Sequence, residues 1–143
     1  MTPFEALSEG SFFNILFFLS YTLNIYYIYQ MAFKEKLKSF SEIQKVIDKK
    51  DGMTLFYFTH PDCAVCSVIK PKIEEFLREH SRISGYHSSL DDDPMIAGQL
   101  TIYSIPMVLI YMEGREILRE GKFIVMDVLE PKIQRLMDNF GIV

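Results

Sequence analysis

The chain contains two cysteines, Cys63 and Cys66, and they lie between an apolar run and a segment with helical periodicity. The run at 53–58 (MTLFYF) is short, rich in aromatic residues and bounded by turn-forming residues, which predicts a buried strand. A cysteine at the start of a helix lies beside unpaired N–H groups and a partial positive charge, which favour the thiolate. Three interpretations are open at this point: a redox pair, two metal ligands, or two small core residues.

Helical and strand patterns alternate along the rest of the chain. In order, the sequence predicts a helix after Ser39, a strand at 53–58, a helix from Cys63 kinked at Pro71, a strand at 83–89, a helix at 95–103 after Asp93, a hairpin at 105–120 and a helix at 125–141. Strands joined by helices pair in parallel, and a hairpin adds antiparallel strands. We therefore expect an α/β fold with a mixed central sheet flanked by helices.

The chain of 143 residues is long enough for one domain with its own hydrophobic core. Its net charge of −4 and the absence of a basic tract in the sequence argue against nucleic acid as a partner. A disulfide between Cys63 and Cys66 would close almost no loop and so would add little stability. If the two cysteines pair, we expect the use of the bond to be chemical.

The N-terminal segment, residues 1–33, differs from the remainder, 34–143, and we treat the two as separate parts. Residues 10–33 contain no charged side chain, and 12–33 as a helix would be about 33 Å long, enough to cross a bilayer. Lys34, Lys36 and Lys38 would then mark the cytoplasmic side. The alternatives are a hydrophobic helix that packs on protein, or a translated leader upstream of a true start at Met31.

Residues 39–141 resemble the thioredoxin family. The matching residues are Cys63-Ala-Val-Cys66, Pro71 in the following helix, Ile105-Pro106 forty residues after the second cysteine, and the hairpin glycines Gly114 and Gly121. The resemblance implies a thioredoxin-like fold in which Cys63 attacks a disulfide and Cys66 resolves the mixed disulfide. It also implies a cis peptide bond before Pro106, with Ile105 and Pro106 lining the groove that accepts the substrate.

The sequence departs from the family at the residues that would tune the thiols. The chain has no tryptophan, and Asp62 precedes Cys63 where the family carries one. Tyr57 occupies the position of the family's buried aspartate, and His87 aligns with the lysine that partners it. Asp62 should raise the pKa of the Cys63 thiol, whereas a protonated His60 would lower it. We therefore take His60, Asp62, Tyr57 and His87 as candidate modulators of thiol pKa, and the alternative for His87 is a structural histidine of the strand.

These observations favour a thiol–disulfide oxidoreductase that reduces a protein or small-thiol disulfide and is itself reduced by an upstream reductant. No cofactor is implied, and no metal is expected, because His60 with the two cysteines falls one ligand short of a zinc site. We expect a cytoplasmic protein, or one anchored through 12–33 with its domain facing the cytoplasm, where thiols are kept reduced. The alternative function is a non-catalytic interaction module that binds a partner through its groove or N-terminal helix.

Overall fold

A computed structural model describes residues 19–23 and 32–143. Residues 19–23 are helical, and most of the hydrophobic segment at 1–33 lies outside the described residues. Among the residues that the structure describes, no helix has the length and apolar character needed to cross a membrane. Residues 1–31 and 32–143 form two separate units. Ala32 and Phe33 pack against the core of the second unit, although the sequence placed them in the hydrophobic segment.

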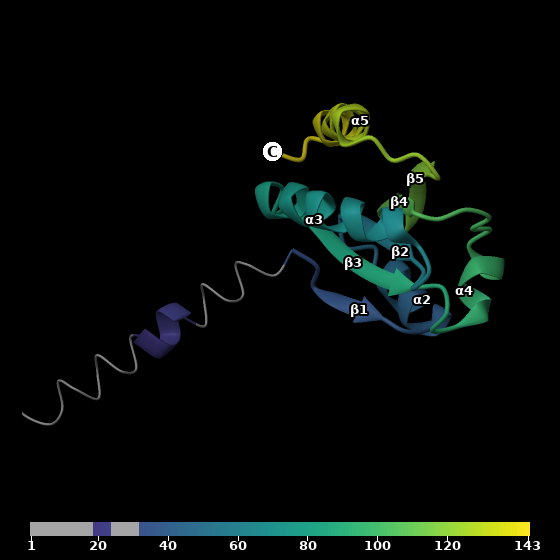
Figure 1. The fold of residues 1–143 in the computed structure, drawn as a ribbon. Coiled ribbons are helices and arrows are strands. Elements are labelled where there is room, and N and C mark those ends of the chain that lie inside the picture. Colours follow the sequence, from purple (N-terminus) through teal and green to yellow (C-terminus); the bar gives the residue numbers. More distant parts are fainter. Residues whose placement is uncertain (1–18, 24–31) are drawn as a thin grey trace, which may run out of the picture. The chain divides into compact units, whose positions relative to one another are not determined.

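The second unit contains five strands and four helices, with the helices on both sides of the sheet (Figure 1). Their bounds are β1 (Glu35–Leu37), α2 (Phe40–Asp48), β2 (Met53–Thr59), α3 (Ala64–Glu79), β3 (Ile83–Ser89), α4 (Pro94–Gln99), β4 (Met107–Met112), β5 (Arg115–Gly121) and α5 (Met126–Asn139). The sheet order is β1-β3-β2-β4-β5. The predicted mixed sheet is confirmed, since β1, β3 and β2 pair in parallel and β4 and β5 are antiparallel.

β1 is an element that the sequence analysis missed. It is three residues long, and its first two residues, Glu35 and Lys36, are exposed charged side chains. Only Leu37 is buried, so the strand has no apolar run or alternation of useful length. β1 is a strand only because it pairs with β3, where Lys36 lies opposite His87. The local sequence contains no sign of this pairing.

Two hydrophobic layers enclose the sheet. On one face, α3 and α5 pack through Ile73 and Leu129 onto Leu55 and Tyr57 of β2. On the other face, α2 and α4 pack through Ile43 and Ile96 onto the intervening β2 residues, among them Phe56. β2 has neighbours on both edges and helices on both faces, and all seven of its residues are buried. Its continuous apolar sequence follows from this position.

Side chains at the helix starts fix where the chain leaves the sheet. Ser39 caps α2, the helix predicted after this residue, and accepts a hydrogen bond from the N–H of Glu42 at 3.2 Å. Asp93 caps α4 and accepts from the N–H of Met95 at 2.9 Å. The same carboxylate also accepts from the N–H of Phe40 at 2.9 Å, and so joins the starts of α2 and α4.

Gly85 in β3 is a point of close packing between the sheet and α3. A Cβ atom at this position would overlap Cδ1 of Leu77 and would lie 3.1 Å from the carbonyl oxygen of Ala32. Leu77 is 3% exposed and belongs to the core between α3 and the sheet. A side chain at residue 85 would therefore have to displace a packed leucine.

We predict that Gly85→Ala lowers the free energy of unfolding by about 1–3 kcal/mol, because the added methyl group overpacks the core against Leu77. Urea unfolding of the full chain measures this change. Gly98→Ala is the matched control, since a Cβ at Gly98 in α4 would have no atom within 4 Å. The control should be neutral or slightly stabilising. A Gly85→Ala variant as stable as the wild type would contradict the packing.

Candidate redox site

Cys63 and Cys66 are joined by a disulfide bond, with their Cα atoms 5.3 Å apart. Cys63 is the N-cap of α3, and its Sγ accepts a hydrogen bond from the N–H of Cys66 at 3.2 Å. The Cys63 side of the bond is partly accessible to solvent, whereas Cys66 is 3% exposed. The two sulfurs are therefore distinct, because only one of them can be approached readily from solution.

The end of β2 sets the position of this disulfide. β2 ends at Thr59, and the next three residues, His60-Pro61-Asp62, form the turn into α3. The turn is closed by a hydrogen bond from the N–H of Cys63 to the carbonyl of His60 at 3.1 Å. No acidic side chain lies in the first turn of α3. The free N–H groups and the dipole of this helix end therefore favour a thiolate at Cys63, and no carboxylate in the first turn opposes them.

Tyr57 lies beneath the motif and is fully buried. Its hydroxyl donates a hydrogen bond to the backbone carbonyl of Cys66 at 2.8 Å. Burial raises the pKa of the Tyr57 hydroxyl well above its ordinary value, so the group remains a neutral donor across the physiological pH range. Tyr57 therefore links the core strand to the backbone of the buried cysteine and carries no charge.

His87 is the cross-strand neighbour of Tyr57, and the centroids of their rings are 6.1 Å apart. Its Nε2 lies 2.8 Å from the hydroxyl of Thr59, at the end of β2. Burial is the main cause that lowers the pKa of His87 to about 4. The positive charges of Lys70 and Lys36 act in the same direction, and Asp92 acts in the opposite direction. His87 is thus neutral at pH 7.

His60 and Asp62 lie on the solvent side of the turn. The N–H of Asp62 donates to Nδ1 of His60 at 3.2 Å, and the Asp62 carboxylate lies 3.7 Å from the same nitrogen. The Asp62 side chain is 93% exposed. Water screens the charge of Asp62, so the carboxylate opposes a thiolate at Cys63 less than its neighbouring place in the sequence indicates. Among the described residues, no group of three His, Cys, Asp or Glu side chains is arranged to hold a metal ion.

The segment before β4 reaches the same end of the sheet. The peptide bond between Ile105 and Pro106 is cis. Met107 pairs with Phe58, so Pro106 follows in register beside the last residue of β2, from which the cysteine turn begins. Pro106 is buried and Ile105 is half-buried. The carbonyl of Pro106 accepts a hydrogen bond from the N–H of Lys122 at 3.0 Å, which ties this segment to the end of β5.

The structure brings Tyr57 to the backbone of Cys66 and His87 to Tyr57. Asp62 lies in the solvent, and His60 is half-buried in the turn. The structure also adds three residues that the sequence analysis did not single out: Thr59, Lys70 and Phe33. Thr59 and Lys70 act on His87, and the Phe33 ring stacks on Tyr57 with centroids 6.3 Å apart. A polar residue at the end of an apolar strand could have drawn attention to Thr59, but no sequence signal placed Lys70 or Phe33 here.

We predict that the protein becomes less stable as the pH falls from about 6.5 to about 4. In this range the unfolded chain binds a proton at His87 and the folded chain does not, because the folded pKa of His87 is about 4 and its ordinary value is 6.5. His87→Gln removes this contribution, so its free energy of unfolding should vary less with pH. Urea unfolding at several pH values in this range measures the slope.

A direct control is an NMR titration of the His87 ring in two lysine variants. Lys70→Gln should move the pKa of His87 toward its ordinary value of 6.5, because the variant removes a positive charge that lowers it. Lys72→Gln, two residues further along α3, is the matched control and should leave the titration unchanged. A titration of His87 at its ordinary pKa in the wild type would contradict the burial described above.

Comparison with known proteins agrees with this geometry. The family model Thioredoxin matches residues 33–135. The thioredoxin-like protein YdfQ of Bacillus subtilis is 30% identical over 100 residues, which cover 70% of this chain and 88% of that protein. Thioredoxin-2 of Saccharomyces cerevisiae is 29% identical over 84 residues, covering 59% of this chain and 81% of the relative.

Solved structures show the same fold. Thioredoxin from Plasmodium falciparum superposes with a TM-score of 0.65 at 18% identity, covering 71% of this chain and 97% of that one. Thioredoxin from Fasciola hepatica gives a TM-score of 0.65 at 20% identity with the same coverage. The family match and the Cys-x-x-Cys disulfide make this protein a thiol–disulfide oxidoreductase. The chain belongs to the thioredoxin family.

Proposed function

We propose that the protein reduces disulfide bonds, with Cys63 as the nucleophile and Cys66 as the resolving thiol. The observation that carries this proposal is the unequal environment of the two sulfurs. Cys63 is partly exposed at the N-terminus of α3, whereas Cys66 is buried one turn further along. Attack on a substrate needs an accessible thiolate, and resolution needs a second thiol within reach of the first.

The proposed reaction begins with both cysteines reduced. The Cys63 thiolate attacks one sulfur of the substrate disulfide, which forms a mixed disulfide and releases the other substrate sulfur as a thiolate. The Cys66 thiolate then attacks Sγ of Cys63, which releases the second substrate thiol and forms the Cys63–Cys66 disulfide. The substrate has gained two electrons and two protons. An upstream reductant returns the same number to the cysteine pair.

The helix N-terminus is the main source of thiolate stabilisation in this proposal. His87 is neutral above pH 4, so it adds no positive charge near the motif at pH 7. Tyr57 is a neutral donor and cannot act as a base for the Cys66 thiol. We assign Tyr57 a positioning role, because its hydroxyl holds the Cys66 carbonyl. The proton of the resolving thiol then leaves to water or to the departing substrate thiolate.

The proposed substrate groove lies along Ile105 and Pro106. Their segment ends beside the strand that carries the cysteine turn, so a chain lying along it would pass close to the exposed sulfur. The partners are a protein or small-thiol disulfide as substrate and an upstream reductant. Reduction is favoured over oxidation where the surrounding compartment keeps thiols reduced.

We predict that Cys63→Ser abolishes disulfide reduction, because serine cannot attack the substrate sulfur at neutral pH. Cys66→Ser should still attack but should accumulate the mixed disulfide, because the resolving thiol is missing. Insulin reduction measures turnover, and mass spectrometry of the Cys66→Ser variant detects the trapped adduct. Ala64→Ser is the matched control: it introduces a serine between the cysteines and should keep activity within about twofold of the wild type.

A Cys63→Ser variant that still reduces insulin would contradict the assignment of the nucleophile. If the wild type shows no exchange with insulin or with small disulfides, the alternative function gains support. In that case the protein is an interaction module that binds a partner through its groove or N-terminal helix, and its cysteines are incidental.

We further propose that the domain works on the cytoplasmic side of a membrane and is held there through residues 12–31, since Ala32 and Phe33 pack against the core of the domain. The support is the uncharged stretch 10–33 followed by Lys34, Lys36 and Lys38. Full-length protein should remain with alkaline-washed membranes, and the variant Leu16→Arg/Phe17→Arg should move to the supernatant, because charges in an apolar stretch oppose insertion. Wild-type protein found only in the supernatant would contradict the anchor.

A further inference from the structure

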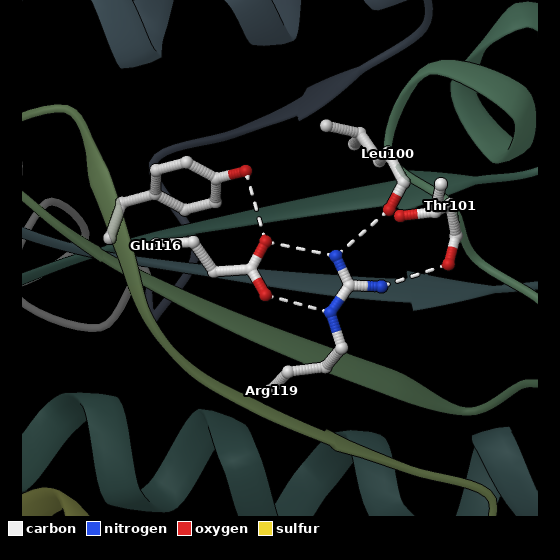
Figure 2. A network of polar contacts seen from close by, with 5 residues as sticks. Leu100, Thr101, Glu116 and Arg119 are labelled. Atoms are coloured by element: carbon white, nitrogen blue, oxygen red, sulfur yellow. Dashed lines mark hydrogen bonds and ion pairs between the residues drawn. The ribbon is translucent and has the colours of Figure 1, made fainter.

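Arg119 in β5 forms a network with its own strand and with the end of α4, as Figure 2 shows. Its Nε and Nη2 donate to the two carboxylate oxygens of Glu116 at 2.7 and 2.9 Å. Its Nη1 donates to the backbone carbonyl of Thr101 and its Nη2 to that of Leu100, both at 2.9 Å. The hydroxyl of Tyr111 lies 3.5 Å from the Glu116 carboxylate.

The two carbonyls belong to the exit from α4. Leu100 is the C-cap of this six-residue helix, and Thr101 has a φ of 50°, in the left-handed region. The last carbonyls of a helix lack partners within it, and a cation there also complements the helix dipole. Arg119 satisfies both carbonyls at once. Its planar guanidinium can do so while it pairs with Glu116, which a lysine ammonium cannot match.

β5 holds the other end of the same segment as well. Lys122, which directly follows β5, donates its N–H to the carbonyl of Pro106 at 3.0 Å. The residues between 101 and 106 are thus attached to β5 at their start through Arg119 and at their end through Lys122. Within this span Tyr103 is 91% exposed, whereas Ile102 is buried and donates its N–H to Ala97 at 2.9 Å.

We propose that Arg119 is a positioning residue for substrate binding: it fixes the segment 100–106 so that Ile105 and Pro106 present a preformed edge to the substrate. The inference rests on the proposed function, since it concerns the groove beside the Cys63–Cys66 pair. Arg119 touches neither the cysteines nor, in this account, the substrate. Arg119 therefore affects how well the groove is ordered, and it does not affect the chemistry of the thiols.

The network is only partly shielded from solvent. The Arg119 and Glu116 side chains are 32% and 31% exposed, and water weakens an ion pair at that depth. A second ion pair on β5 offers a comparison. Lys132 of α5 lies 2.7 Å from Glu120, with side chains 47% and 27% exposed, and it makes no contact with the segment 100–106 among the described interactions.

The test compares Arg119→Ala, Arg119→Lys and Lys132→Ala in the full chain. For Arg119→Ala we expect KM for insulin to rise about threefold or more, because a misplaced groove loses binding contacts. We expect kcat and the rate with a small aromatic disulfide to stay within about twofold. Arg119→Lys should be intermediate, and Lys132→Ala should match the wild type in every assay.

Hydrogen exchange provides a readout that does not depend on activity. The amides of residues 103–105 should exchange faster in Arg119→Ala than in the wild type, and the amides of β2 should not. Unchanged exchange together with an unchanged KM overturns the inference. Equal losses with insulin and the small disulfide also overturn it, because they indicate general damage. An inactive wild type, by contrast, defeats the proposed function itself.

Discussion

The pairing of β2 with β3 on one side and β4 on the other holds the site together. β2 is buried along its whole length, so its C-terminal end is held by neighbouring strands at both edges and by helices on both faces. The cysteine turn leaves from that end, and Tyr57 reaches from the same strand to the backbone of Cys66. β3 brings His87 to Thr59, and β4 brings Pro106 alongside.

The environment beneath the disulfide is neutral. A tyrosine whose burial raises its pKa and a histidine whose burial lowers its pKa lie side by side, so neither carries a charge at pH 7. The positive charges of Lys70 and Lys36 act on His87 and help to keep it unprotonated. In our proposal, the helix terminus and solvent therefore control the reactivity of the thiols. This arrangement differs from a site in which a buried carboxylate exchanges protons with the resolving cysteine.

The sequence predicted the elements whose signals are local. A strong local pattern marks the apolar run of β2, the helical face of α3 and the hairpin of β4 and β5. The resemblance at the cysteines and Ile105-Pro106 then predicted the fold. The missed features depend on contacts between distant segments. β1 is defined by its pairing with β3, and Thr59 meets His87 across 28 residues of chain.

The network of Arg119 could not be predicted for the same reason. Its geometry depends on the register of β5 against β4, which shifts between Ile110 and Tyr111, and on the exit from α4. A left-handed backbone at Lys122, with a φ of 64°, was also unexpected, because the glycine that the family resemblance placed at this turn is Gly121. Sequence pattern located the cysteines, but only the folded chain shows what supports the segment opposite them.

The proposed chemistry requires Cys63 and Cys66 to form a reversible redox couple. A titration of the full chain in glutathione buffers, with the oxidised fraction read by alkylation and mass spectrometry, tests it most directly. We expect reversible equilibration at a potential between about −300 and −180 mV, the range of exchanging dithiols and their compartments. A disulfide that stays intact through this whole range, or a pair that does not reoxidise, would contradict the account.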